Sequence, residues 1–139
     1  GGSFRTVDAV RRFSALDRYA MGLVPETAVP PFFYVESPTN ISGTILGAAA
    51  APKIGVTFNG TRRDVLIQDV IAIEGPRLPA SSDAPKVLRQ AFIYVVGQGR
   101  SIDAEHVAKL ERIRLDWGVF FEQATDGLGR VETRLRPPT

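Results

Sequence analysis

The longest regular pattern of apolar positions along the chain lies between residues 101 and 124. Apolar side chains recur there every three or four residues, the spacing that places them along one face of an α-helix. The Asp126-Gly127 pair has turn chemistry and predicts that the helix ends just before it. The predicted apolar stripe comprises Ile102, Val107, Leu110, Ile113, Trp117, Phe120, Phe121 and Ala124.

Three shorter runs rich in β-branched and aromatic residues predict strands. Residues 32–35 follow two prolines, which suit an edge strand or the start of a strand. Residues 87–96 end in five contiguous apolar positions, which predict an interior strand covered on both faces, with Trp117 buried against it. Residues 130–135 alternate between polar and apolar positions, which predicts a half-exposed final strand.

A tight hairpin and a short helix are predicted in the middle of the chain. Asn59-Gly60 stands between two β-like runs, at residues 56–58 and 63–67. This pair is typical of a two-residue type I′ turn, or of a slightly longer loop if Thr61 joins it. The apolar positions of residues 68–74 predict a short helix, which the Gly-Pro pair after it ends.

The remaining segments lack a clear period. Residues 1–12 predict a loop or a partly ordered arm, and residues 37–52 predict a surface connection, with a mobile cover over a groove as the alternative. Together the elements predict an α+β fold. It would have a mixed or mainly antiparallel sheet of four to five strands, one long C-terminal amphipathic helix and two short helices. The length of 139 residues suits one domain, expected over residues 13–136.

The stretch between residues 13 and 31 carries the sharpest local signals. Ser14 occupies a helix N-cap position, and Asp17 three residues later suits the positive end of the helix dipole. Gly22 can adopt the left-handed conformation that ends a helix, and Pro25 prevents the helix from continuing. We expect a short capped helix that leads into a loop stiffened by prolines. The apolar positions of this helix are Leu16, Tyr19, Ala20 and Leu23.

Composition and charge narrow the classes of function. The 17 basic and 15 acidic residues are mixed along the chain and leave a formal net charge of +2, so we expect no nucleic-acid partner. No apolar run approaches the ~20 residues that span a bilayer, so we expect no membrane partner. The absence of cysteine excludes disulfides and thiolate ligands. The single histidine, His106, is interpreted as a solvated residue in the first turn of the long helix.

The stretch from residue 13 to residue 31 reads F-S-A-L-D-R-Y-A-M-G-L-V-P and ends in V-P-P. It resembles a region of large secreted bacterial proteins related to zinc metallopeptidases. In those proteins the pattern is similar to F-S-x-L-[DE]-x-Y-x-M-G-L-x-P followed by V-P-P. Later blocks of the chain are similar to the same proteins and come in the same order. They are residues 60–62 leading into 65–70, residues 74–77, residues 108–110, Ile113-Arg114 and Trp117.

The resemblance implies a supporting part rather than a complete active site. In such proteins the zinc-binding histidines and the catalytic glutamate lie upstream on an HExxH helix, a motif that this chain does not contain. Met21 would form the floor beneath the metal, because an uncharged, polarizable side chain packs there without competing for the ion. Ordinary core packing of Met21 is the alternative. Zinc would belong to the parent protein and not to this chain. Candidates for a substrate-groove wall are Tyr19, Gly22, Pro25, Pro30 and Pro31.

Two hypotheses about function remain open. In the first, the chain is the downstream portion of a secreted zinc metallopeptidase, with an upstream catalytic segment of the same, larger protein as its partner and a peptide as substrate. In the second, it is a non-catalytic α+β binding or structural module of a secreted bacterial protein. An HExxH motif within the ~100 residues upstream in the parent gene would favour the first. A signal peptide directly before Gly1 would favour the second.

Overall fold

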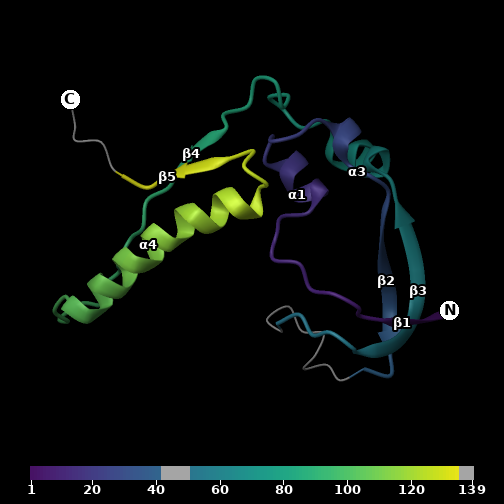
Figure 1. Ribbon diagram of the computed structural model, residues 1–139, viewed down its shortest axis with the longest axis horizontal. Helices are drawn as coiled ribbons and strands as arrows, with labels where there is room; N and C mark the ends of the chain where they lie inside the picture. The colour runs from purple at the N-terminus through teal and green to yellow at the C-terminus, as the bar shows by residue number, and fades with distance from the viewer. Residues whose placement is uncertain (42–50, 135–139) are drawn as a thin grey trace. The chain divides into compact units, whose positions relative to one another are not determined.

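The computed structural model describes residues 1–41 and 51–134 (Figure 1). Their contacts form two compact units. The first unit combines Gly1–Arg11 with Glu26–Arg77, and the second unit combines Arg12–Pro25 with Leu78–Thr139. The α+β class is confirmed, because helices and strands are mixed and the long helix lies near the C-terminus. The elements are β1 (Gly2–Arg5), α1 (Ala15–Ala20), the 3-10 helix η1 (Glu26–Ala28), β2 (Phe32–Thr39), β3 (Thr57–Val65), α3 (Ile67–Glu74), β4 (Val87–Arg89), α4 (Ala104–Ala124) and β5 (Arg130–Glu132).

The first unit is built on an antiparallel sheet with the strand order β1-β3-β2 (Figure 1). The edge position of β2 agrees with the two prolines before it. The strand β1 corrects the prediction of a loop or arm at the N-terminus. Phe4 pairs with Phe58 of β3, and their stacked ring centroids lie 5.8 Å apart. Residues 2–5 show little strand propensity of their own, so their extended conformation depends on pairing with β3.

The predicted hairpin at Asn59-Gly60 is wrong. These two residues lie in the middle of β3, with β1 paired on one side and β2 on the other. The register of β2 shifts between Glu36 and Thr39, opposite this point. A Cβ atom built on Gly60 would lie 3.1 Å from the Glu36 carbonyl oxygen and would clash with a methyl group of Val35. Glycine is therefore needed here for close packing against an irregular strand, and not for a turn.

The predicted short helix is confirmed as α3, which begins slightly earlier than its apolar pattern suggests. Asp69 explains the early start, because its Oδ2 accepts a hydrogen bond from the Leu66 backbone N–H at 2.8 Å. Gly75 ends the helix with φ of 82°. Ile67 of α3 and Val29 after η1 are both buried and belong to the core of the first unit.

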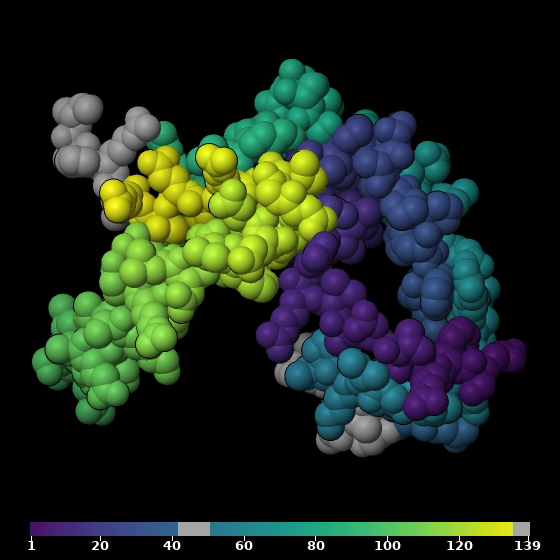
Figure 2. All heavy atoms as spheres, in the orientation of Figure 1, coloured from purple at the N-terminus to yellow at the C-terminus, as the bar shows by residue number. Residues whose placement is uncertain are grey.

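In the second unit, α4 runs beside the parallel pair β4–β5 and packs against β5 (Figure 1). Asp103 caps the helix by accepting a hydrogen bond from the Glu105 backbone N–H at 2.8 Å. The predicted stripe is buried only at its C-terminal end, at Phe121 and Ala124. The first half of α4, drawn in green in Figure 2, projects beyond β4 and β5 of the same unit. Four predicted stripe residues are exposed: Ile102, Val107, Ile113 and Phe120.

The predicted interior strand at residues 87–96 is also wrong. Only Val87–Arg89 form a strand, and Ile93 and Val95 are 78% and 82% exposed. An apolar run predicts a strand that could be covered on both faces, but it cannot reveal whether a second layer covers the outer face. Trp117 is half-buried rather than fully buried, and its Nε1 donates a hydrogen bond to Gln90 Oε1 at 2.6 Å.

Two further predictions lie partly outside the described residues. Most of the predicted connection at 37–52 falls on residues 42–50, and the end of the predicted last strand falls on residue 135. The part of that strand within the described range is β5. Among the helices described, none has the length and the apolar character needed to cross a membrane.

Candidate functional site

The candidate site is the segment that includes α1, here called the α1 corner (residues 13–25). Its start is set by a reciprocal cap. The Ser14 Oγ accepts a hydrogen bond from the Asp17 N–H at 3.1 Å, and Asp17 Oδ2 accepts one from the Ser14 N–H at 2.9 Å. Two orphan donors at the helix start are satisfied in this way, which stabilises a helix of only six residues. The prediction of a capped helix is confirmed.

The end of α1 is closed by backbone hydrogen bonds around Gly22. The Gly22 N–H donates to the Tyr19 carbonyl, and the Leu23 N–H donates to the Arg18 carbonyl, both at 2.8 Å. This pair of bonds defines a Schellman motif, which needs a left-handed residue at its centre. Gly22 meets that requirement with φ of 74°. The turn at Met21–Gly22 is thus a closed, regular helix end.

Lys86 clamps the same turn from outside the helix. Its Nζ donates hydrogen bonds to the carbonyl oxygens of Gly22 at 2.6 Å, Leu23 at 3.3 Å and Ser81 at 2.7 Å. An ammonium group offers three donors, and these three acceptors use all of them. The carbonyls of the helix end are therefore satisfied by a charged side chain, which also ties α1 to the segment before β4.

The other side of the α1 corner packs on the end of α4. The Phe13 backbone N–H donates to the Ala124 carbonyl at 2.9 Å, and the Phe13 ring meets Phe121 edge-on with centroids 5.8 Å apart. Thr125 is fully buried, and its Oγ1 donates to the Phe121 carbonyl at 2.8 Å. A Cβ on Gly129 would lie 3.2 Å from Leu23 and Phe121 side-chain atoms. This close packing makes a small core within the second unit.

Charged contacts complete the α1 corner. Asp126, at the turn after α4, pairs with Arg18 at 2.6 Å and with Arg12 at 2.9 Å.

A second charged contact lies within α4 itself. The hydrogen bond between Arg114 and Glu111 lowers the pKa of Glu111 and raises the pKa of Arg114. Arg114 Nη1 also donates to Thr133 Oγ1 at 2.7 Å, which links α4 to the chain after β5.

The predicted site residues divide between the two units. In the second unit, Tyr19 is buried, Met21 is half-buried and Pro25 is exposed. Pro30 and Pro31 are exposed and belong to the first unit. Gly22, at the turn after α1, is buried. Whether these residues line a groove, and whether Met21 supports a metal, stays a prediction.

The described residues contain no cluster of three or more His, Asp or Glu side chains that could hold a metal ion. The expectation that zinc belongs to the parent protein and not to this chain stays a prediction. His106 is exposed, as expected for a solvated helix residue. Its Nδ1 lies 3.2 Å from the Tyr94 hydroxyl and 3.5 Å from Asp103 Oδ2.

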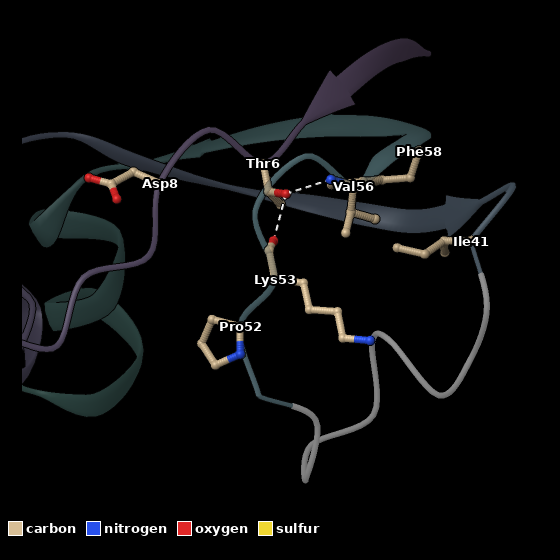
Figure 3. A pocket seen from close by; sticks show the side chains of 7 residues that line it. All are labelled: Thr6, Asp8, Ile41, Pro52, Lys53, Val56 and Phe58. Carbon is tan, nitrogen blue, oxygen red and sulfur yellow. Dashed lines mark hydrogen bonds between the residues drawn. The ribbon is translucent and has the colours of Figure 1, made fainter.

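The first unit contains a small pocket of about 210 Å³ (Figure 3). Thr6 links the two chain segments that line it, because the Thr6 Oγ1 donates a hydrogen bond to the Lys53 carbonyl at 2.7 Å and accepts one from the Val56 N–H at 2.9 Å. Pockets that enclose small molecules usually measure roughly 300–1,000 Å³, so this one is too small to define a ligand site. It is lined by Thr6, Asp8, Ile41, Pro52, Lys53, Val56 and Phe58.

Lys86 and Thr125, which lie outside the α1 corner, are the residues around it that the sequence did not reveal. Lys86 lies 64 positions from Gly22, and nothing in its neighbourhood indicates a carbonyl clamp. A threonine just after a helix is normally interpreted as an exposed turn residue.

Comparison with protein-family models, curated proteins and solved structures gives no match for this chain. Any functional assignment therefore rests on its own residues and on the resemblance described above.

Replacing Lys86 by methionine should lower the free energy of unfolding by about 1–2 kcal/mol, because charge-assisted hydrogen bonds to the Gly22 and Leu23 carbonyls are lost. Urea unfolding followed by far-UV circular dichroism measures this change. Lys109→Met, at an exposed position of α4, is the matched control and should change stability by less than about 0.5 kcal/mol. Equal effects of the two substitutions would contradict a clamp at Lys86.

Proposed function

We propose that this chain acts as a non-catalytic supporting module, as the downstream portion of a secreted zinc metallopeptidase-like protein. In that role it supports the fold and contributes a wall of the substrate groove. The zinc ligands and the catalytic glutamate would come from an upstream segment of the same protein. Peptide substrate and zinc would then belong to the assembled parent.

The observation that carries the proposal is the rigidity of the α1 corner. Both ends of α1 are closed by hydrogen bonds, and Lys86 and the end of α4 hold the corner from two sides. A segment that must present a fixed edge to a substrate benefits from such stiffness, because less conformational entropy is lost on binding. The exposed Pro25 after the turn adds to that stiffness.

A second candidate is a non-catalytic binding or structural module without any link to a peptidase. The contacts of the α1 corner also support this candidate. The buried Tyr19 and Leu23, together with the hydrogen bonds from Lys86, stabilise the second unit, and this stabilisation needs no role at an active site. Under this reading the Met21–Gly22 turn is a structural corner. The two candidates differ in whether Met21 affects activity apart from stability.

Met21→Ala in the full-length parent protein should lower peptidase activity at least about tenfold without a matching fall in melting temperature, because a residue that orients ligands acts on the site rather than on folding. Peptide hydrolysis and thermal unfolding of the same preparation measure the two effects. Leu16→Ala is the control, because Leu16 is a half-buried residue of α1 that is not among the predicted floor and groove-wall residues.

The control variant should lose stability and keep its activity per folded molecule. Activity of the Met21→Ala parent that is unchanged, or that falls only in step with stability, would overturn the role at an active site. In that case Met21 is ordinary packing, and the second candidate function is the better one.

A further inference from the structure

The chain after β4 presents an unpaired backbone, here called the free edge (residues 91–97). The ladder with β5 ends where the Gln90 N–H donates to the Glu132 carbonyl at 3.0 Å. The next backbone hydrogen bond closes a turn from the Arg100 N–H to the Gly97 carbonyl at 3.0 Å. Within the described part of the chain, residues 91–96 make no backbone hydrogen bond. The backbone N–H and C=O groups of these six residues are thus available to a partner strand.

Side-chain contacts hold the free edge in place on α4. Gln90 accepts a hydrogen bond from Trp117 just before it, and the Tyr94 hydroxyl contacts His106 at 3.2 Å. Burial alternates along residues 91–96, as it does in an extended chain with one face covered. Ile93 and Val95 lie on the open face and are among the most exposed apolar residues of the chain. The edge is therefore ordered by α4 and is open to association.

The free edge lacks the features with which proteins usually block edge strands. Residues 91–97 contain no lysine, no proline and no charged residue. Phenylalanine, isoleucine, tyrosine and valine fill most of these positions, and all of them favour strands. An uncharged, β-prone segment with an unpaired backbone is a template for the addition of another strand. Its partner must itself be extended, uncharged and unpaired.

We propose that the free edge pairs with the free edge of a second copy of this chain, as an antiparallel strand pair around a two-fold axis at Tyr94. The segment meets its own requirements for a partner, and a two-fold interface is self-complementary. In this register Ile93 lies opposite Val95 of the second copy. Arg89 and Arg100 lie outside the paired residues, opposite Gly99 and Leu88 of the second copy. Like charges therefore do not face each other.

The first test is the oligomeric state of the intact chain. Sedimentation velocity over a roughly hundredfold range of concentration should show a monomer–dimer equilibrium, because association follows mass action. The double variant Ile93→Lys/Val95→Lys should stay monomeric, since it places four positive charges side by side across the axis. The double variant Val7→Lys/Ile73→Lys, at positions that are 81% and 83% exposed, adds the same charge elsewhere and should leave the dimer intact.

At concentrations where the wild type is monomeric, thermal unfolding should be unchanged in these variants, because the replaced side chains are exposed and no dimer adds to the stability of the wild type. A wild-type chain that is monomeric throughout the range would overturn the proposal. Dimers that the Ile93→Lys/Val95→Lys chain forms as readily as the wild type would overturn it as well.

The second test addresses the register by disulfide cross-linking. Because the chain contains no cysteine, an introduced cysteine is its only thiol. Chains with Ile93→Cys and chains with Val95→Cys are oxidised separately and as an equimolar mixture. The mixture should form disulfide-linked dimers faster than either chain alone, because opposite residues in an antiparallel pair have the closest Cβ atoms. Faster cross-linking of the Ile93→Cys chain by itself would overturn the register with Tyr94 on the axis.

Discussion

Replacing Phe121 by alanine should lower the free energy of unfolding of the second unit by about 3–5 kcal/mol, the usual cost of removing a large buried aromatic side chain. Phe121 is only 2% exposed. Its ring meets Phe13 at 5.8 Å and Trp117 at 5.9 Å between centroids. The substitution would therefore open a cavity between the α1 corner and the end of α4, where small residues such as Gly129 cannot fill the space.

The measurement is urea unfolding followed by far-UV circular dichroism and by the fluorescence of Trp117, the only tryptophan, which reports on the second unit. Phe120→Ala is the matched control, because Phe120 is the neighbouring residue on the same helix and is 42% exposed. It should cost only about 1 kcal/mol, since less apolar surface is removed from water there. If both variants lost the same stability, Phe121 would not be the centre of this core.

The parts of the fold that follow from local chemistry were predictable from the sequence. Ser14 and Asp17 form a cap within four residues, and Gly22 supplies a left-handed conformation that other residues rarely adopt. The end of α4 likewise coincides with the turn at Asp126-Gly127, where both residues have positive φ. Each of these signals acts through backbone groups close in sequence, so no distant partner is needed to interpret it.

The parts that depend on distant partners were not predictable in the same way. Gly60 follows asparagine in a turn-like pair, yet β1 and β2 pair with both sides of β3 and the strand continues through this residue. The apolar run that includes Ile93 and Val95 looks like an interior strand, but the side chains of these two residues are exposed. Periodicity reports which face of an element is apolar, and only the tertiary structure decides whether that face is covered.

In the candidate site, too, the features set by local sequence were predictable and those set by distant contacts were not. The position of Met21 at a helix end followed from the cap and from Gly22, because both act within the same short stretch. The clamp by Lys86 depends on a contact across 64 positions, and single-sequence patterns carry no information on such pairs. A chemical role for the site depends on groups that lie close together in space, which explains why the sequence alone left two functions open.

Gly60→Ala should lower the free energy of unfolding by about 2–3 kcal/mol, in the upper range for overpacking a tight contact. The added methyl group would meet the Val35 side chain and the Glu36 carbonyl oxygen, and the backbone atom cannot move aside without breaking the β2–β3 pairing. Hydrogen exchange of the β3 amides measures the effect within the first unit. The double variant Gly60→Ala/Val35→Ala should recover part of the loss, because it removes one of the two obstacles.

Gly118→Ala is the matched control and should have the opposite sign. Gly118 lies within α4, and a Cβ built there would have no described atom within 4 Å beyond its chain neighbours and the backbone of the helix itself. Alanine should then stabilise the helix by about 0.5–1 kcal/mol, because it loses less backbone entropy than glycine on folding. The same chemical change would thus destabilise a strand at one site and stabilise a helix at the other. A Gly60→Ala chain as stable as the wild type would show that β2 can yield at its irregular point, and that glycine is not required there.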